Sequence, residues 1–172
     1  MKKSIKQEVI VRVALILLVV IVTGLMTING MKRVKKYSEA TGQAADINAL
    51  VLTAEKAHYG WVENLCSSIS MGTEFTGSTN YQTCVLGNWL YGDTSTIEDK
   101  EMLRIMEEMK PIHQTIHESA ETILQLNETD HEAAKDMYLN TTKANVEKLV
   151  ALLEQVSKIT QQEVLDSEAG LS

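Results

Sequence analysis

Residues 83–92 read Thr83-Cys84-Val85-Leu86-Gly87-Asn88-Trp89-Leu90-Tyr91-Gly92, and the rest of the chain is organised around this stretch. It places a thiol next to two large aromatic side chains and a glycine, which lets two backbones approach closely. One histidine, His58, lies upstream, and His113 and His117 lie downstream. Thiolate sulfur and imidazole nitrogen are the ligands that zinc prefers, and four of them close a tetrahedral site. The sequence therefore predicts that Cys84 and these three histidines bind one zinc ion.

The two downstream histidines have the spacing of a metal-binding pair. His113 and His117 are separated by one helical turn, so on a helix both rings lie on one face and reach the same ion. Such a pair alone is more often a surface or hydrogen-bonded core feature, and His58 alone has the same ordinary explanation. The interpretation as a site rests on the combination of the three with Cys84.

The composition is typical of an all-α domain. The chain has 172 residues, 5% aromatic residues and one proline, and it is rich in strong helix formers. Its net charge is −7, and no basic stripe exists outside the region that flanks the apolar N-terminal run. This pattern argues against a nucleic-acid-binding surface.

The N-terminal region predicts a single-pass membrane protein. Residues 1–8 form a basic tail, and residues 9–29 are almost wholly apolar and long enough for a transmembrane helix. A cleaved signal peptide is the alternative, although no small-x-small cleavage site follows the run closely. Basic residues lie on both sides of the run, so the positive-inside rule does not choose an orientation.

The remaining sequence predicts a four-helix bundle preceded by the one N-terminal transmembrane helix. Residues 30–45 are the juxtamembrane start of the first long helix, and residues 46–168 form the bundle. Pro111 is expected to kink or break the third helix just before His113. The expected helices cover residues 36–71, 81–91, 97–126 and 131–166, and a Gly/Ser/Thr-rich loop covers residues 72–80.

These residues carry a resemblance to a known family. His58-x-x-Trp61, Cys84-x-Leu86-Gly87-x-Trp89-x-Tyr91-Gly92 and Pro111-x-His113-x-x-x-His117 occur in the order and at the intervals of the chemoreceptor zinc-binding (CZB) domain family. The resemblance spans residues 46–126. It implies a small helical bundle, often a homodimer, that binds Zn²⁺ through His58, Cys84, His113 and His117.

The resemblance also implies a function in signal transduction. Domains of this family attach to chemotaxis receptors and diguanylate cyclases and respond to zinc or to oxidation of the ligand cysteine. Here the domain directly follows an apparent membrane span, which is similar to the sensor part of a membrane-bound methyl-accepting chemotaxis-type receptor. We therefore expect an extracytoplasmic bundle that is not an enzyme. The signalling output domain or partner protein is expected outside this chain.

Two other functions stay open at this point. A zinc enzyme would need an open coordination position and a base such as Glu55, Glu63 or Glu118, whereas four protein ligands fill the coordination sphere. A metal-free, membrane-anchored interaction protein would also explain the long helices. Cys66 fits a small buried apolar residue, and a disulfide between Cys66 and Cys84 is possible only outside a reducing compartment.

Overall fold

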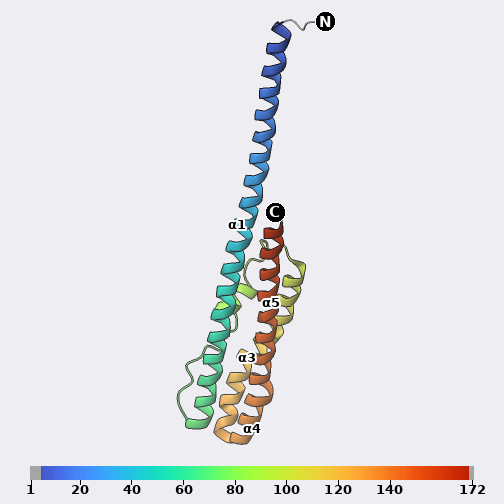
Figure 1. Cartoon of the computed structure of the whole chain (residues 1–172). Coiled ribbons are helices and arrows are strands. Elements are labelled where there is room, and N and C mark those ends of the chain that lie inside the picture. The colour runs from blue at the N-terminus through green and yellow to red at the C-terminus, as the bar shows by residue number, and fades with distance from the viewer. Residues whose placement is uncertain (1–4, 171–172) are drawn as a thin grey trace. The chain divides into compact units, whose positions relative to one another are not determined.

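The structure, a computed structural model, describes residues 5–170 of the chain. Lys2 and Lys3 of the expected basic tail therefore lie outside the described residues. Every helix or strand element within residues 5–170 is a helix, which confirms the all-α prediction. The elements are α1 (Ile5–Met71), α2 (Val85–Leu90), α3 (Lys100–Thr129), α4 (His131–Met137), the π-helix η1 (Tyr138–Lys143) and α5 (Ala144–Ala169) (Figure 1).

The chain divides into two compact units, and the first consists of Met1–Gly42 together with Glu163–Ser172. In this unit the large apolar side chains of α1 between Val9 and Ile28 are exposed. By length and composition this part of α1 is able to cross a membrane. Farther along α1, the Arg33 guanidinium donates a hydrogen bond to the Gly170 carbonyl.

The second unit, Gln43–Gln162, contains the hydrophobic core. Each of its long helices contributes fully buried side chains, because each repeats apolar residues at three- and four-residue steps. Burying one such side chain stabilises the fold by about 1.5–3 kcal/mol. The fully buried set includes Leu65 of α1, Leu86 of α2, Ile116 of α3 and Leu153 of α5.

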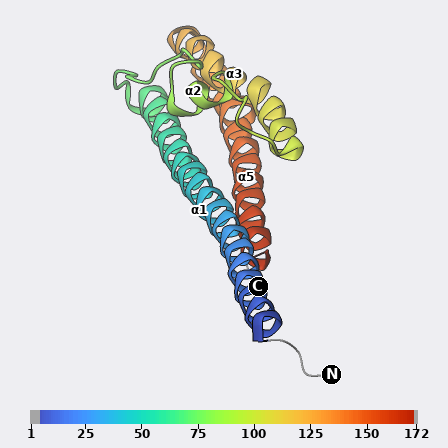
Figure 2. The same ribbon diagram turned by 90° about the horizontal axis from the view of Figure 1, so that it is seen from above.

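A glycine ends α1 and begins the loop to α2. Gly72 has a φ of 64°, the left-handed conformation that only glycine adopts at little cost, and its N–H donates to the Ser68 carbonyl. The loop then leads from the end of α1 to α2, which packs on α3 (Figure 2).

The start of α2 corrects the expected helix over residues 81–91. The helix begins only at Val85, and Cys84 is its N-cap with extended backbone angles (φ −74°, ψ 167°). A turn precedes it, in which the Gln82 N–H donates to the Asn80 side chain. The Cys84 sulfur accepts a hydrogen bond from the Gly87 N–H, as a serine oxygen does at an ordinary N-cap.

Of the expected kink or break at Pro111 in the third helix, the break is wrong. α3 continues from Lys100 to Thr129 with Pro111 in its interior. A proline removes one backbone hydrogen bond. However, Met109 and His113 on either side of it are fully buried, so tertiary packing holds the segment helical. The two histidines of α3 therefore share a face because of their ordinary helical spacing.

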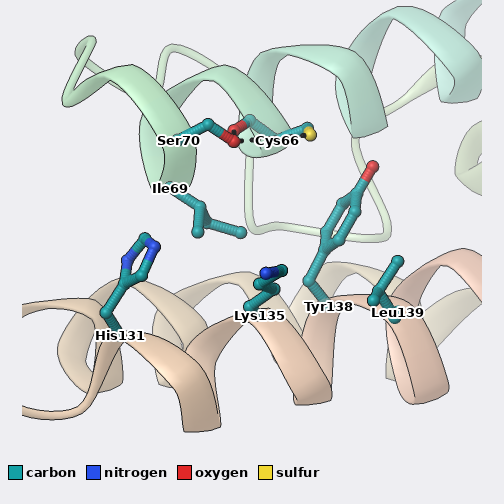
Figure 3. Close-up of a pocket in the computed structure, with 7 residues that line it drawn as sticks. All are labelled: Cys66, Ile69, Ser70, His131, Lys135, Tyr138 and Leu139. Atoms are coloured by element: carbon teal, nitrogen blue, oxygen red, sulfur yellow. Dashed lines mark hydrogen bonds between the residues drawn. The ribbon is translucent and has the colours of Figure 1, made fainter.

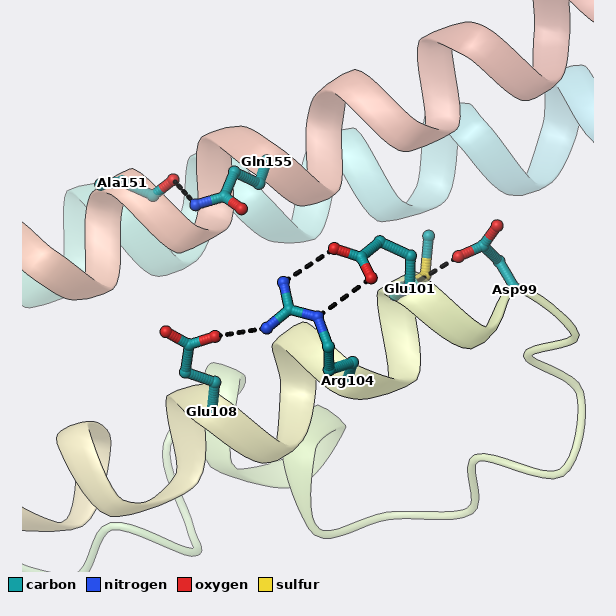
Figure 4. Close-up of polar contacts among 7 residues, drawn as sticks. Asp99, Glu101, Arg104, Glu108, Ala151 and Gln155 are labelled. Carbon is teal, nitrogen blue, oxygen red and sulfur yellow. Dashed lines mark hydrogen bonds and ion pairs between the residues drawn. The ribbon is translucent and has the colours of Figure 1, made fainter.

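Polar side chains fix the first turns of α3 (Figure 4). Asp99 caps the helix by accepting a hydrogen bond from the Met102 N–H at 2.7 Å, which explains why the helix starts after the expected Ile97. Arg104 then pairs with Glu101 and Glu108 at 2.7 Å each. These ion pairs are solvent-exposed, so water screens them and they add little to stability.

The last expected helix is divided by the π-helix η1. Ala134, Tyr138, Thr142 and Val146 are buried at three successive four-residue steps. In an α-helix each such step rotates the side chain by about 40° past a full turn, so the set would leave the core. A π turn contains more residues than an α turn, so it cancels this extra rotation and keeps all four side chains on the buried face.

Candidate metal centre

Four side chains from three helices converge in the second unit. His58 lies on α1, Cys84 caps α2, and His113 and His117 lie on α3. Their ligand atoms all lie within 4.8 Å of one another. The histidines are 3%, 0% and 2% exposed, respectively, and Cys84 is half-buried. The fold therefore brings together all four residues that the sequence singled out.

Backbone carbonyls fix the protonation of two of the rings. His58 Nδ1 lies 2.7 Å from the Ala54 carbonyl oxygen, one turn earlier on α1. His117 Nδ1 lies 2.8 Å from the Ser78 carbonyl oxygen, in the loop between α1 and α2. A carbonyl only accepts hydrogen bonds, so both rings carry their proton on Nδ1. The Nε2 lone pairs of His58 and His117 are therefore free to bind a metal ion, and both atoms are buried without a partner.

The third ring faces the cysteine. His113 Nε2 lies 3.2 Å from Cys84 Sγ. In a tetrahedral zinc site with ordinary bond lengths, a sulfur and a nitrogen ligand lie about 3.5 Å apart. The pair is therefore already close to the separation that a shared ion requires. His113 Nδ1 is also buried without a hydrogen-bond partner among the described residues.

Burial controls the charges of the four groups. It lowers the pKa of His58 and of His117, and it lowers the pKa of His113 to about 3, with a further contribution from the other two rings. Burial raises the pKa of the Cys84 thiol. The N–H groups of Gly87 and Leu86 have the opposite but smaller effect, because they favour the thiolate. In the metal-free protein at neutral pH, the three imidazoles are therefore neutral and the thiol keeps its proton, which must leave when a metal binds.

The donor set fits zinc. Three neutral imidazoles and one thiolate form a mixed nitrogen and sulfur set that matches the preference of Zn²⁺. An unpaired buried nitrogen normally costs about 1–3 kcal/mol, and the cluster contains three such atoms. Coordination by a metal would satisfy the Nε2 atoms of His58 and His117 directly.

Aromatic side chains close the cluster on one side. The Trp61 ring lies 5.2 Å from the His117 ring and 5.3 Å from the Phe75 ring. The bases considered for an enzyme lie outside the four-residue cluster. Of these, Glu63 is exposed, and Glu118 accepts a hydrogen bond from Gln114 on the surface of α3.

The second cysteine lies at a different place. Cys66 and Cys84 are both free thiols. Cys66 lines a pocket between α1 and the α4–η1 segment (Figure 3). The Tyr138 hydroxyl points toward Cys66 in this pocket, and burial together with Cys66 raises its pKa. The other lining residues are Ile69, Ser70, His131, Lys135 and Leu139.

The lowered histidine pKa values predict a pH dependence for the metal-free protein. Below pH 6.5, the ordinary histidine pKa, the histidines of the unfolded chain become protonated. In the folded protein the buried rings stay neutral to lower pH, because their pKa values are lowered, to about 3 for His113. Stability is therefore complete above pH 6.5 and falls as the pH is lowered through this window. We expect the urea midpoint of chelator-treated protein to fall between about pH 7.5 and about pH 5.5.

Two variants identify the origin of that slope. His113→Gln should make the pH dependence shallower, because the ring with the lowest pKa is removed. His131→Gln should leave it unchanged, because His131 is exposed and lies outside the cluster. Equal slopes in both variants would contradict the assignment.

Fold and site together define a helical domain with a candidate metal centre. Residues 58–124 match the model of the chemoreceptor zinc-binding domain family. The match begins at His58 and includes Cys84, His113 and His117, and it supports the resemblance seen in the motifs. No curated protein and no solved structure matches the chain.

The match supports zinc as the metal of this site. Domains of this family bind zinc, and the four side chains are positioned to coordinate such an ion. The family is one of sensor domains and not of enzymes. Sequence reasoning did not find the two carbonyl groups that orient the rings, those of Ala54 and Ser78. Backbone atoms leave no signature in the residue types.

Proposed function

We propose that this protein is the zinc-binding sensor part of a membrane-anchored, chemoreceptor-like signalling protein. The observation that carries the proposal is the buried set of ligand atoms from His58, Cys84, His113 and His117, all within 4.8 Å. The family match over residues 58–124 supports the same metal. Zinc, when bound, would supply a fourfold cross-link between side chains of three helices.

The sensing mechanism is a linkage between binding and conformation. The metal-binding arrangement requires His58 of α1 and the histidine pair of α3 to face the N-cap of α2 at the same time. Any ligand that needs this arrangement shifts the population toward it. The bundle of helices around the core would carry the shift to an output domain or partner protein.

Oxidation of Cys84 is the second input that we propose. A peroxide transfers one oxygen to the Cys84 thiolate, which becomes a sulfenic acid while the peroxide is reduced to hydroxide. The sulfenic acid is a poorer ligand than the thiolate, so the site loosens. Cys84 is half-buried and its pKa is raised by burial in the metal-free protein, so we expect the metal-bound thiolate to be the reactive form.

The metal content of the full chain tests the proposal. Purified in detergent, the protein should bind one zinc per chain. Zinc at 100 times its dissociation constant should stabilise the fold by about 2.7 kcal/mol. For a chain of this size that corresponds to a rise in Tm of about 5–10 °C, reversed by a chelator. Equal Tm values with zinc and with chelator would favour the metal-free interaction protein instead.

The membrane anchor has its own readouts. We propose that residues 9–29 cross the membrane once and that the four-helix bundle lies outside the cytoplasm, as its chemoreceptor-like layout suggests. The protein should then stay in the membrane fraction after alkaline washing. Cys66 is partly exposed and should react with an impermeant maleimide in intact cells. Labelling only after permeabilisation would place the bundle in the cytoplasm.

The partner of this domain is proposed to include a second copy of the chain. Leu52 and Tyr59 are 66% and 48% exposed on α1, two helical turns apart. Apolar side chains at this spacing are suited to a parallel helix contact. Cross-linking of the full chain in detergent should yield dimers, and a monomer at all concentrations would exclude this part of the proposal.

A further inference from the structure

The loop between α1 and α2 accepts a hydrogen bond from one of the four candidate ligands, His117 of α3. We propose that residues 72–80 form a strap that positions His117 and limits the rate at which the metal leaves. Trp61 and Ser78 are its positioning residues. This inference rests on the proposed zinc site, but one of its two tests does not need the metal.

The Ser78 carbonyl is the centre of the strap. It lies 2.8 Å from His117 Nδ1 and accepts a second hydrogen bond from the Trp61 indole N–H at 2.9 Å. The first bond keeps the His117 proton on Nδ1 and aims Nε2 into the cluster. The second bond anchors the carbonyl to α1, so a ring on α3 is oriented by a side chain on another helix.

The strap has a second anchor one turn farther along α1. The Asn64 side-chain oxygen accepts hydrogen bonds from the Thr76 N–H at 2.9 Å and from the Thr76 hydroxyl at 3.3 Å. Ser78 and Thr76 are both exposed, so few core contacts of their own hold them. The three hydrogen bonds to Trp61 and Asn64 of α1 therefore fix the position of the Ser78 carbonyl.

A glycine allows the strap to lie directly on the indole ring. A Cβ atom at Gly77 would come within 2.6 Å of Trp61 Cδ1 and Nε1 and within 2.4 Å of the Phe75 ring. These distances lie far inside van der Waals contact, so a larger residue here would displace the Trp61 and Phe75 rings. Trp61 is thereby enclosed by Phe75 and Gly77 together with the His117 ring, which lies 5.2 Å from its own.

The other oriented histidine does not depend on the loop. His58 donates to Ala54, one turn away on its own helix, and that bond exists whenever α1 is helical. His117 loses its partner when the strap lifts. It is therefore the ligand whose orientation can change without unfolding the bundle, and opening of the strap is the step that releases the metal.

The rate of zinc loss tests this role in the full chain in detergent. Trp61→Phe keeps an aromatic ring but removes the indole N–H, and Trp89→Phe is the matched control at the other tryptophan, on α2. Partners that orient a metal-binding histidine are worth about 10–100-fold in affinity. With excess chromogenic chelator, Trp61→Phe and Gly77→Ala should lose zinc at least about 10-fold faster than wild type. Trp89→Phe should lose zinc at the wild-type rate.

The ring proton gives a readout that simple destabilisation would not change. In zinc-free protein, the nitrogen chemical shifts of labelled histidine should show His117 protonated on Nδ1 in wild type and in Trp89→Phe. In Trp61→Phe, His117 should become a mixture of both tautomers, while His58 remains on Nδ1 in all three proteins.

The outcomes separate the two proposals. Binding of zinc by wild type with equal loss rates in Trp61→Phe and Trp89→Phe overturns the strap and leaves the sensor function intact. An unchanged His117 tautomer in Trp61→Phe also overturns it. If wild type binds no zinc, the proposed function fails, and the tautomer experiment alone decides whether the loop positions His117.

Discussion

A Cys84→Ala variant is expected to bind zinc about 100- to 1,000-fold more weakly than the wild-type chain. A structural zinc site of four ligands contributes about 10–16 kcal/mol, so one ligand contributes about 3–4 kcal/mol. The remaining three histidines are buried in the core, and the Nδ1 hydrogen bonds of His58 and His117 do not involve the sulfur. The variant should therefore stay folded and helical by circular dichroism. Competition against a chelator of known affinity measures the loss.

The chain offers its own control for this experiment. Cys66 is the other free thiol, and it lines the separate pocket shown in Figure 3. Cys66→Ala should therefore bind zinc with the wild-type affinity. If the two alanine variants weaken binding equally, the sulfur of Cys84 is not a ligand, and the four-residue site would have to be abandoned.

The second large effect is expected at Gly87. A Cβ atom here would lie 2.0 Å from the Tyr81 carbonyl oxygen and 2.9 Å from the Gln82 carbonyl carbon. Both are backbone atoms and cannot rotate away as a side-chain tip can. Gly87→Ala should therefore displace the turn that precedes α2, at a cost of about 3 kcal/mol or more. Thermal unfolding should show a drop in Tm of about 6–12 °C.

This variant should also weaken zinc binding, although no ligand is changed. The Gly87 N–H donates to Cys84 Sγ, and the displaced turn carries Cys84 with it. Gly60→Ala is the control, because a Cβ atom there meets nothing within 4 Å on the exposed surface of α1. Alanine in place of that helical glycine should stabilise the protein by about 0.5–1 kcal/mol. A Gly87→Ala protein as stable as Gly60→Ala would contradict the close approach.

Much of the site was predictable from residue types and their spacing. His113 and His117 share a helix face wherever that segment is helical, and the Cys84 motif pointed to close packing by its glycine. The position of Cys84 at an N-cap was harder to predict, because cysteine is not a usual capping residue and Tyr81–Tyr91 has the composition of a short helix. The capping geometry depends on the close approach of the Tyr81 backbone to Gly87, which the residue types do not reveal.

Three further features show where sequence reasoning ends. A proline inside a helix has a local cost, which is why a kink or break is expected at Pro111. Burial of its neighbours decides whether the helix continues. The strap on His117 is made through the Ser78 carbonyl, which every residue type would supply. The π-helix likewise became visible only in the structure, where the buried side chains follow one another at four-residue steps and include the polar Thr142.

That π-helix gives the middle of the last helix a tolerance to the loss of one residue that helices usually lack. Removing one residue from Tyr138–Lys143 would convert the segment to ordinary α-helix, and Val146 would then lie only about 20° past three full turns from Ala134, still on the buried face. The Thr142 hydroxyl lies 2.7 Å from the Ser119 hydroxyl of α3, so this face of the π segment is held against α3. Between Ala134 and Val146 the chain can therefore lose one residue and still bury the same face of α5. A relative with one residue fewer would show an uninterrupted α-helix here and keep the same buried side chains in α5.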